Sequence, residues 1–374
     1  MTDDAQLLQR DVRYIPLLKG KLGELNALQE IGPLERQLML PLIEIVPPGL
    51  DDSDASEIER ELTKFLDRLA SRWPVGQPII LDAGYFPDVP LAGGQMPMEF
   101  VAERAIRRGL SPIAVARPSD SSEVRRAVAN TIIHGANQVC VRIAGEDLDD
   151  EIAPFGEVLP SLLAELEVGV MDAHLVLDFG AIAEGTSALA ARTARYVMAE
   201  LPDLDGWASV TVAAGAFPPE LGAFPAEQWG EIPRVDHTFW GLAADRSRQR
   251  GLRVPSFGDY GIAHPSMPQG AGFAPAPQLR YTADEHWLVL RGRKGLRRGH
   301  AQFYDICARL VAERAEWAGP ELSWGDNRIL EAARSAPDGA DLRVPTGNAT
   351  TWRTIGTSHH LALIVNRLAS PSAL

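Results

Sequence analysis

The sequence predicts an α/β fold, a (β/α)8 TIM-type barrel with a C-terminal hairpin-plus-helix extension. Strand and helix signals alternate from Tyr14 onward, which is typical of βα units built around a parallel sheet. Six short apolar runs in the first half of the chain each end on an ionisable residue, and the carboxyl ends of barrel strands gather at one mouth. The six residues are Lys19, Glu44, Asp82, Arg117, Arg142 and Asp178.

Each of the first four predicted strands precedes a helical segment. The strands are YIPLLK, MLPLIEIVPP, PIILDAGYF and PIAVARPSD, whose apolar runs are expected in a sheet that helices cover on both faces. The helix after the second strand has the clearest pattern, an apolar stripe formed by Ile58, Leu62, Phe65, Leu66 and Leu69. The segments GKLGELNALQEI, MEFVAERAIRRGL and SSEVRRAVANTIIHGA supply the other three helices.

Four further strands complete the predicted barrel. VCVRIAGEDL, HLVLDFGAIA and WASVTVAAGAF are the fifth to seventh, with helices PSLLAELEVGVMDA and SALAARTARYVMAEL between them. The eighth strand has the weakest signal. Residues 254–265 are the best candidate because they follow a helical stretch and place Asp259 and Tyr260 near a strand end. We therefore assign residues 1–277 to the barrel.

A Gly- and Pro-rich segment, residues 264–277, predicts a loop or linker before the C-terminal extension. The extension, residues 278–374, is expected to pack over the barrel. It starts with a hairpin that turns at residues 282–285, continues with the helix HAQFYDICARLVAERAEW and ends with the helix SHHLALIVNRL. Thr357 or Ser358 is the candidate N-cap of that last helix, which packs through Leu361, Leu363, Ile364 and Leu368.

Composition excludes several classes of protein. The net charge of −14 disfavours binding to duplex nucleic acid through general electrostatics. The chain has no 18-residue apolar stretch, and its first residues lack the apolar region of a signal peptide, so we expect a cytoplasmic protein with no membrane partner. Cys140 and Cys307 lie far apart in apolar segments and are expected to be buried thiols.

A local basic segment at residues 280–298 stands out on this acidic chain. Two interpretations stay open: contacts to a phosphate or a nucleic acid strand, or a solvated hairpin with basic loops. The basic residues are Arg280, Arg291, Arg293, Lys294, Arg297 and Arg298.

The six residues at the strand ends suggest a site for an anionic ligand. Three carboxylates at one mouth repel one another unless a metal or the basic side chains neutralise them. We expect Glu44, Asp82 and Asp178 to bind Mg2+ or Mn2+, because these ions prefer oxygen ligands. Arg117 and Arg142 end neighbouring strands, where two guanidinium groups suit a phosphate or carboxylate.

Lys19 has two candidate roles, a third phosphate contact or a Schiff-base amine. An alternative for the whole series is structural, with Lys19 and Glu44, or Arg142 and Asp178, forming ion pairs that have no catalytic role.

The C-terminal segment supplies further candidates. Trp352, Arg353, His359 and His360 fall in a Gly- and Thr-rich stretch that can close over the barrel mouth as an anion clamp or acid–base group. The alternative is that this stretch belongs to a packing helix. The expected catalytic residues are Lys19, Glu44, Asp82, Asp178, His359 and His360. The expected ligand contacts are Arg117, Arg142, Asp259, Tyr260, Arg291, Trp352 and Arg353.

Four segments carry a resemblance to a known family. They are GNATTWRTIGTSHHL at residues 347–361, RYT at 280–282, the W(L)V(L)RG run at 287–292 and the opening YIPLLKGKLGELNAL. Together they resemble the Beta protein family of phages and bacteria, and the resemblance covers nearly the whole chain. It implies no assigned catalytic activity, and it implies a setting among mobile elements and defence loci.

Two functions follow as hypotheses, and whether the chain is an enzyme stays open between them. The first is a metal-dependent hydrolase or lyase that acts on a phosphorylated or otherwise anionic small molecule, such as a nucleotide. The alternative is a non-catalytic ligand- or protein-binding component of a phage-conflict (antiviral defence) system. A nucleic-acid role ranks third and depends only on the basic segment.

Overall fold

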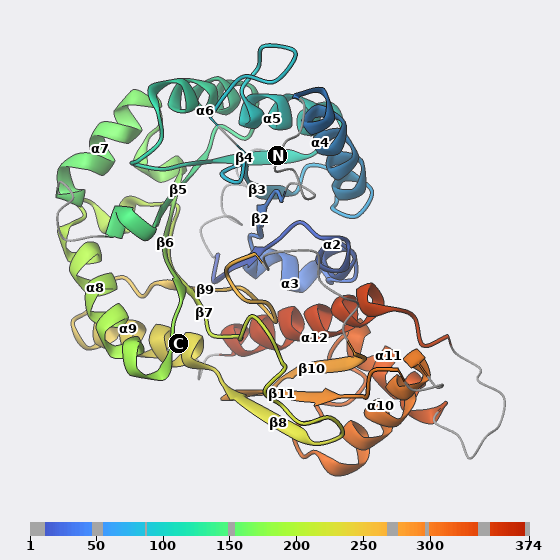
Figure 1. The fold of residues 1–374 in the computed structure, drawn as a ribbon. Helices are drawn as coiled ribbons and strands as arrows, with labels where there is room; N and C mark the ends of the chain where they lie inside the picture. The colour runs from blue at the N-terminus through green and yellow to red at the C-terminus, as the bar shows by residue number, and fades with distance from the viewer. Residues whose placement is uncertain are drawn as a thin grey trace.

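Eight parallel strands close into a barrel in the computed structural model, in the order β1-β2-β3-β4-β5-β6-β7-β9 (Figure 1). The structure describes residues 12–46, 55–86, 88–148, 154–267, 276–295, 299–335 and 345–370. The predicted TIM-type barrel is therefore confirmed, including its uncertain eighth strand. The strands are β1 (Tyr14–Leu18), β2 (Leu42–Glu44), β3 (Pro78–Asp82), β4 (Ser111–Ala116), β5 (Val139–Ala144), β6 (Ala173–Ala181), β7 (Ser209–Gly215) and β9 (Ser256–Asp259).

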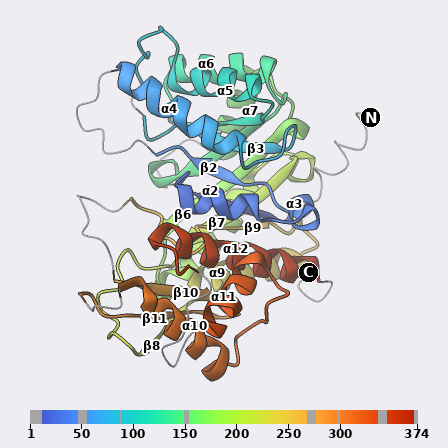
Figure 2. The ribbon, with the colours of Figure 1, turned by 90° about the vertical axis from the view of Figure 1, so that its right-hand side faces the viewer.

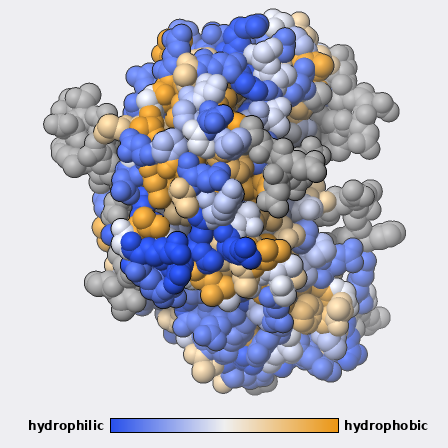
Figure 3. Space-filling view, turned by 90° about the vertical axis from the view of Figure 1, so that its left-hand side faces the viewer, coloured by the Kyte–Doolittle hydropathy of each residue, from blue (hydrophilic) through white to orange (hydrophobic). Residues whose placement is uncertain are grey.

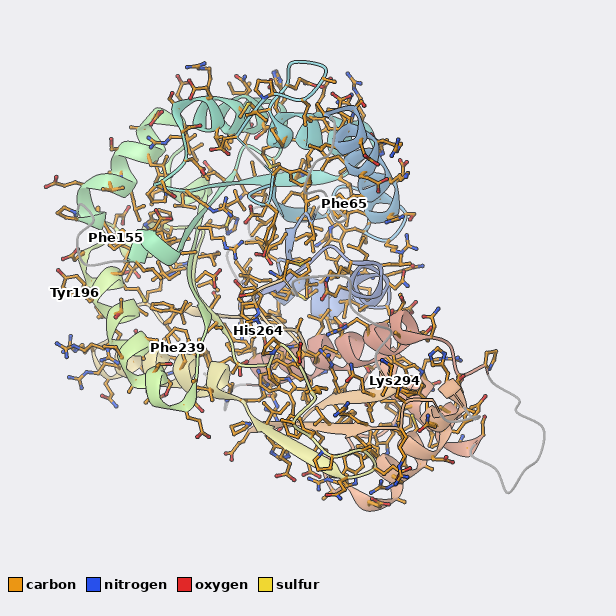
Figure 4. The ribbon with its side chains drawn as sticks, in the orientation of Figure 1. Phe65, Phe155, Tyr196, Phe239, His264 and Lys294 are labelled. Atoms are coloured by element: carbon orange, nitrogen blue, oxygen red, sulfur yellow. The ribbon has the colours of Figure 1, made fainter. Side chains whose placement is uncertain are left out.

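Helices cover the outer face of the barrel. The predicted stripe of α4 is buried against the strands, and Phe65 of α4 and Phe239 of α9 (Figure 4) belong to the same outer core. The helices of this layer are α2 (Leu22–Gln29), α3 (Pro33–Leu38), α4 (Ala55–Ala70), α5 (Pro97–Arg107), α6 (Ser122–His134), α7 (Phe155–Glu165), α8 (Ser187–Glu200) and α9 (Val235–Gln249). None of the described helices combines the length and apolar character needed to cross a membrane. The face in Figure 3 is mostly hydrophilic, with scattered apolar side chains.

Strand residues alternate between two apolar cores, because successive side chains of a strand point to opposite faces. Residues of the outer core, such as Leu18 and Ile43, face the helices. Residues of the inner core fill the barrel, and each of the six ionisable residues follows one of them by two positions. The six inner residues are Leu17, Leu42, Ile80, Val115, Cys140 and Val176. The alternation therefore points the six ionisable side chains inward.

Two strands of the extension and one earlier strand form a three-stranded antiparallel sheet in the order β10-β11-β8. The predicted hairpin is confirmed as β10 (Gln278–Thr282) and β11 (His286–Arg291). The third strand, β8 (Trp229–Pro233), comes from the connection between β7 and α9 and was not predicted. Helices α10 (Gln302–Glu313) and α11 (Trp324–Arg334) share an apolar core with the sheet.

Helix α12 (Ala349–Ala369) lies between the barrel and the rest of the extension (Figure 2). Leu361, Ile364, Val365 and Leu368 join the outer core of the barrel, while the N-terminal half of the helix joins the core of the extension. Packing by Leu361, Ile364 and Leu368 is therefore confirmed, although Leu363 is only half-buried.

The prediction that Thr357 or Ser358 caps the last helix is wrong. The helix begins about two and a half turns earlier, at Ala349, where the side chain of Asn348 accepts hydrogen bonds from the backbone amides of Thr350 and Thr351. His359 and His360 consequently lie in the middle of the helix.

Two elements cross the predicted boundary at residues 277/278. Strand β8 precedes the boundary and pairs with β11, and α12 follows it and packs on the barrel. The division into two domains stays a prediction. The first residues of the chain, Arg297, Arg298 and part of the predicted linker lie outside the described residues.

Candidate functional site

The six predicted side chains meet at the carboxyl end of the barrel, where Tyr260 joins them. We call this set the mouth network: Lys19, Glu44, Asp82, Arg117, Arg142, Asp178 and Tyr260. Arg117 is 22% exposed, while the other ionisable members are at most 7% exposed. The convergence follows from the parallel strands, whose inward-facing positions end on the same rim.

Arg142 lies at the centre of the mouth network. Its Nη1 donates to Asp82 Oδ2 at 2.6 Å, and its Nη2 donates to Glu44 Oε1 at 3.0 Å and to Asp178 Oδ2 at 2.5 Å. The Tyr260 hydroxyl accepts from Nη2 at 2.9 Å and donates to Asp178 at 2.6 Å. One guanidinium thus joins carboxylates from three strands.

The other two cations pair with the same carboxylates. Arg117 Nη2 donates to Asp82 Oδ2. Lys19 Nζ forms an ion pair with Glu44 Oε2 at 2.5 Å and donates to the exposed Tyr85 hydroxyl at 2.8 Å. Acidic and basic groups are therefore interleaved, and the two structural pairs considered from the sequence, Lys19 with Glu44 and Arg142 with Asp178, are both present.

These contacts keep Asp82 and Arg142 charged. Burial raises the pKa of Asp82, but Arg117 and Arg142 outweigh it and leave that pKa well below its usual value. Burial lowers the pKa of Arg142, but Asp178 and its other acidic neighbours raise it well above the ordinary range. Burial followed by Asp178 raises the pKa of Tyr260, so this hydroxyl stays protonated at neutral pH.

A metal ion among these carboxylates would need Arg142 to move, because its guanidinium already donates to all three. The predicted metal site stays a prediction. Within the described ranges, the group with the spacing of metal ligands is instead Glu231, His286 and Glu316, in and beside the extension sheet. Arg314 Nη2 lies 2.7 Å from a carboxylate oxygen of both glutamates and offsets part of their negative charge.

A small pocket of about 40 Å³, with room for two or three water molecules, adjoins the mouth network at Arg117. Asp120 also lines it and accepts a hydrogen bond from the backbone amide of Arg117 at 2.7 Å. Burial raises the pKa of Asp120 to about 6, although that hydrogen bond and the Arg117 charge oppose the rise. The sequence analysis singled out neither Asp120 nor Tyr85 as a site residue. Both residues follow a strand end by a few positions, which is the signal that could have found them.

Asp259 does not join the mouth network. It lies on the outer face of β9, where its carboxylate accepts from the Tyr14 hydroxyl at 2.7 Å and lies 2.8 Å from His360 Nε2. Burial raises the pKa of Asp259, but His360 and Arg234 outweigh it and set that pKa at about 2. Since neighbouring strand residues face opposite ways, Tyr260 occupies the inward position that Asp259 was expected to share.

His359 points into the extension. Its Nδ1 lies 2.9 Å from Asp326 Oδ2 and its Nε2 lies 2.8 Å from the carbonyl oxygen of Thr282, while its ring stacks on Tyr281 at 3.8 Å. His359 and His360 are both fully buried where α12 meets its neighbours. The structure therefore places neither imidazole in the mouth network.

The other predicted ligand contacts also lie elsewhere. Arg291 donates to carbonyl oxygens of the loop at residues 221–224. Trp352 stacks on Phe303 with ring centroids 4.0 Å apart, in the core of the extension. Arg353 lines a separate cavity beside α2.

Comparison with known proteins identifies a family. A family model described as Beta protein matches residues 14–366. No curated protein matches the chain. Among solved structures, the chain is similar to a crystal structure of tryptophan synthase from M. tuberculosis, with 14% identity and a TM-score of 0.26. That match covers 52% of this chain and 83% of the other.

Proposed function

This chain belongs to the Beta protein family, and we propose that it is an enzyme acting on a small phosphorylated or otherwise anionic molecule, such as a nucleotide. The supporting observation is the convergence of six ionisable side chains from six strands at the carboxyl end of the barrel. Active sites of TIM-type barrels lie at this end. Buried ion pairs contribute little to stability, because desolvation offsets their attraction, so stability alone is a weak reason for the network.

The proposal gives separate roles to residues at the open edge of the network. Arg117 is the anion contact, because it is the most exposed of the cations and uses one Nη to bind Asp82. Asp120 is the general base, because a carboxyl with a pKa of about 6 changes charge near neutral pH. Arg142 positions the surrounding carboxylates through its hydrogen bonds.

The reaction class is hydrolysis or elimination with proton transfer at Asp120. No step passes through the predicted Mg2+ or Mn2+ ion, since Arg142 occupies the space between its three expected ligands. The remaining N–H donors of Arg117 hold the anionic group of the substrate beside Asp120.

The test is a turnover screen of the purified chain against nucleotides, other phosphate esters and carboxylate substrates, followed by a pH profile. Activity is expected to rise through about pH 6, as Asp120 loses its proton. Asp120→Asn should lower kcat by about 10²–10⁴-fold. Arg117→Gln should mainly raise KM, while Arg246→Gln, at an exposed position of α9, should change neither. Absence of turnover across the panel, or a fully active Asp120→Asn variant, would contradict the proposal.

A second candidate function is a non-catalytic ligand- or protein-binding component of a phage-conflict system. It is favoured by the internal pairing of the mouth network, in which every carboxylate already has a cationic partner. Binding of an anionic ligand or a protein partner that depends on Arg117, without turnover, would support this function instead.

A further inference from the structure

A cavity of about 260 Å³ lies between α2, α12 and β10. Its size is close to the lower limit of about 300 Å³ for pockets that bind small molecules. It shares no residue with the mouth network. Its lining includes the basic residues Lys21, Arg280 and Arg353 and, among several apolar residues, Ile262, Phe303 and Trp352.

Two arginines of this cavity have no carboxylate partner in the part of the chain that the structure describes. Nη1 of Arg280 and Nη1 of Arg353 donate to the same acceptor, the carbonyl oxygen of Ile262, at 2.7 and 2.8 Å. Among the described residues, no carboxylate oxygen forms an ion pair with either guanidinium. Burial, followed by the charge of Arg353, lowers the pKa of Arg280 well below its ordinary value. Two like charges thus lie together in a partly desolvated wall.

The nearby carboxyl group does not balance these charges. Glu24 of α2 attracts both arginines, but it is fully buried and its Oε2 has no hydrogen-bond partner. Burial raises the pKa of Glu24, and even when it is ionised this single carboxylate supplies only one negative charge against the cations of the cavity. Lys21, at the N-cap of the same helix, adds a third positive charge to the cavity. The described lining therefore carries an excess of positive charge, which a bound anion would neutralise.

Close packing of the backbone holds the two arginines in place. A Cβ at Gly23 would lie 2.8 Å from Arg353 Cγ, so only glycine lets α12 approach α2 this closely. A Cβ at Gly356 would lie 2.8 Å from the carbonyl oxygen of Arg280, which brings α12 against β10 in the same way. The arginines are therefore set by rigid elements and need no rearrangement to bind an anion.

We infer that this cavity is a second anion site, which binds the phosphate group of a small phosphate monoester between Lys21, Arg280 and Arg353. A phosphate accepts hydrogen bonds from two guanidinium groups and carries up to two negative charges, so it fits three cations better than a single carboxylate does. Phe303 and Trp352 provide an apolar wall for the remainder of the ester. The inference does not depend on catalysis at the mouth network.

The test is isothermal titration of the full chain at low salt with inorganic phosphate, phenyl phosphate and phenol. Wild type is expected to bind both phosphates, with phenyl phosphate tighter, and to bind phenol more weakly than either. Arg280→Gln and Arg353→Gln should each weaken phosphate binding by about tenfold or more, the loss expected for one charge-assisted contact. Arg246→Gln is the matched control and should bind like wild type.

Lys21→Gln keeps the test usable if the arginine variants do not fold, because Lys21 is exposed and its side chain makes no capping hydrogen bond at the start of α2. It should weaken phosphate binding measurably while leaving the melting temperature unchanged. Absence of phosphate binding by wild type, or equal affinity in all variants, would overturn the inference. Binding that is lost in Arg117→Gln but kept in Arg280→Gln would place the anion at the mouth, which overturns the second site and leaves the proposed function standing.

Discussion

Arg142 determines the electrostatics of the barrel mouth, because its guanidinium donates to carboxylates from three strands. Each of those carboxylates is nearly inaccessible to water. A buried ion pair contributes little net stability, yet removal of one partner leaves an uncompensated charge. The effect of losing Arg142 should therefore be large and should depend on pH.

Replacing Arg142 with methionine is expected to reduce the free energy of unfolding by about 3–5 kcal/mol near neutral pH. In wild type the pKa of Asp82 is depressed, so its contribution to stability is present above its unfolded pKa and is lost as the pH falls through the folded value. Without the guanidinium the buried carboxylates lose a positive neighbour, so their ionisation in the folded state becomes less favourable and the deficit should grow as the pH rises. Urea unfolding at pH 5 and pH 8 measures this difference.

Arg246→Met is the matched control for this experiment, since Arg246 is exposed on α9. Its free energy of unfolding should stay within about 0.5 kcal/mol of wild type at both pH values. If Arg142→Met shows the same deficit at pH 5 and pH 8, the carboxylates are not the source of the loss.

The sequence identified the residues of the mouth network because apolar runs that end on an ionisable residue mark strand ends. The sequence was less informative about which side chains of a strand or helix face the barrel mouth. Asp259 and Tyr260 are adjacent, and only the register of the four-residue strand β9 determines which one faces inward. The position of His359 and His360 relative to the barrel mouth depends on where α12 begins. That start is set by Asn348 and by packing, since the Thr- and Gly-rich first half has low intrinsic helix propensity.

At the scale of elements, α11 and α12 touch through backbone atoms. A Cβ at Gly325 of α11 would lie 2.2 Å from the carbonyl oxygen of Ile355 on α12. Gly325→Ala should therefore force the helices apart and reduce the free energy of unfolding by about 1–3 kcal/mol. Thermal or urea unfolding of the purified variant gives the value.

Gly241→Ala is the matched control, because Gly241 lies within α9 and a Cβ there would meet no atom within 4 Å. Alanine favours the helix over glycine, so this variant should gain about 0.5–1 kcal/mol. The free energy of unfolding is therefore expected to fall for Gly325→Ala and to rise for Gly241→Ala. A gain in stability at Gly325 would show that the contact between α11 and α12 is looser than described.

Elements with strong local patterns were the ones that sequence analysis predicted, and α4 with its apolar stripe is the clearest example. Strand β8 was overlooked because it has five residues and only two of them, Gly230 and Ile232, are buried. It pairs with β11, more than fifty residues further along the chain. Such a strand is stabilised by a distant partner, which local periodicity does not reveal.

At the scale of the whole molecule, α12 connects two apolar cores. Its C-terminal half completes the outer core of the barrel beside β1 and α2, and its N-terminal half completes the core of the extension. The barrel therefore depends on a helix that lies about 90 residues after its last strand. The predicted boundary at residues 277/278 therefore separates the barrel from a helix that it needs.

A chain that ends at residue 277 is expected not to form a stable barrel. It lacks Leu361, Ile364, Val365 and Leu368, whose burial contributes about 1.5–3 kcal/mol each, or about 6–12 kcal/mol together. That sum is comparable to the entire stability of a typical domain, about 5–15 kcal/mol. Limited proteolysis and urea unfolding should show a protease-sensitive chain without a cooperative transition, while the full chain should resist proteolysis and unfold cooperatively. Cooperative unfolding of residues 1–277 would instead establish that segment as an independent domain, with α12 as an accessory to its surface.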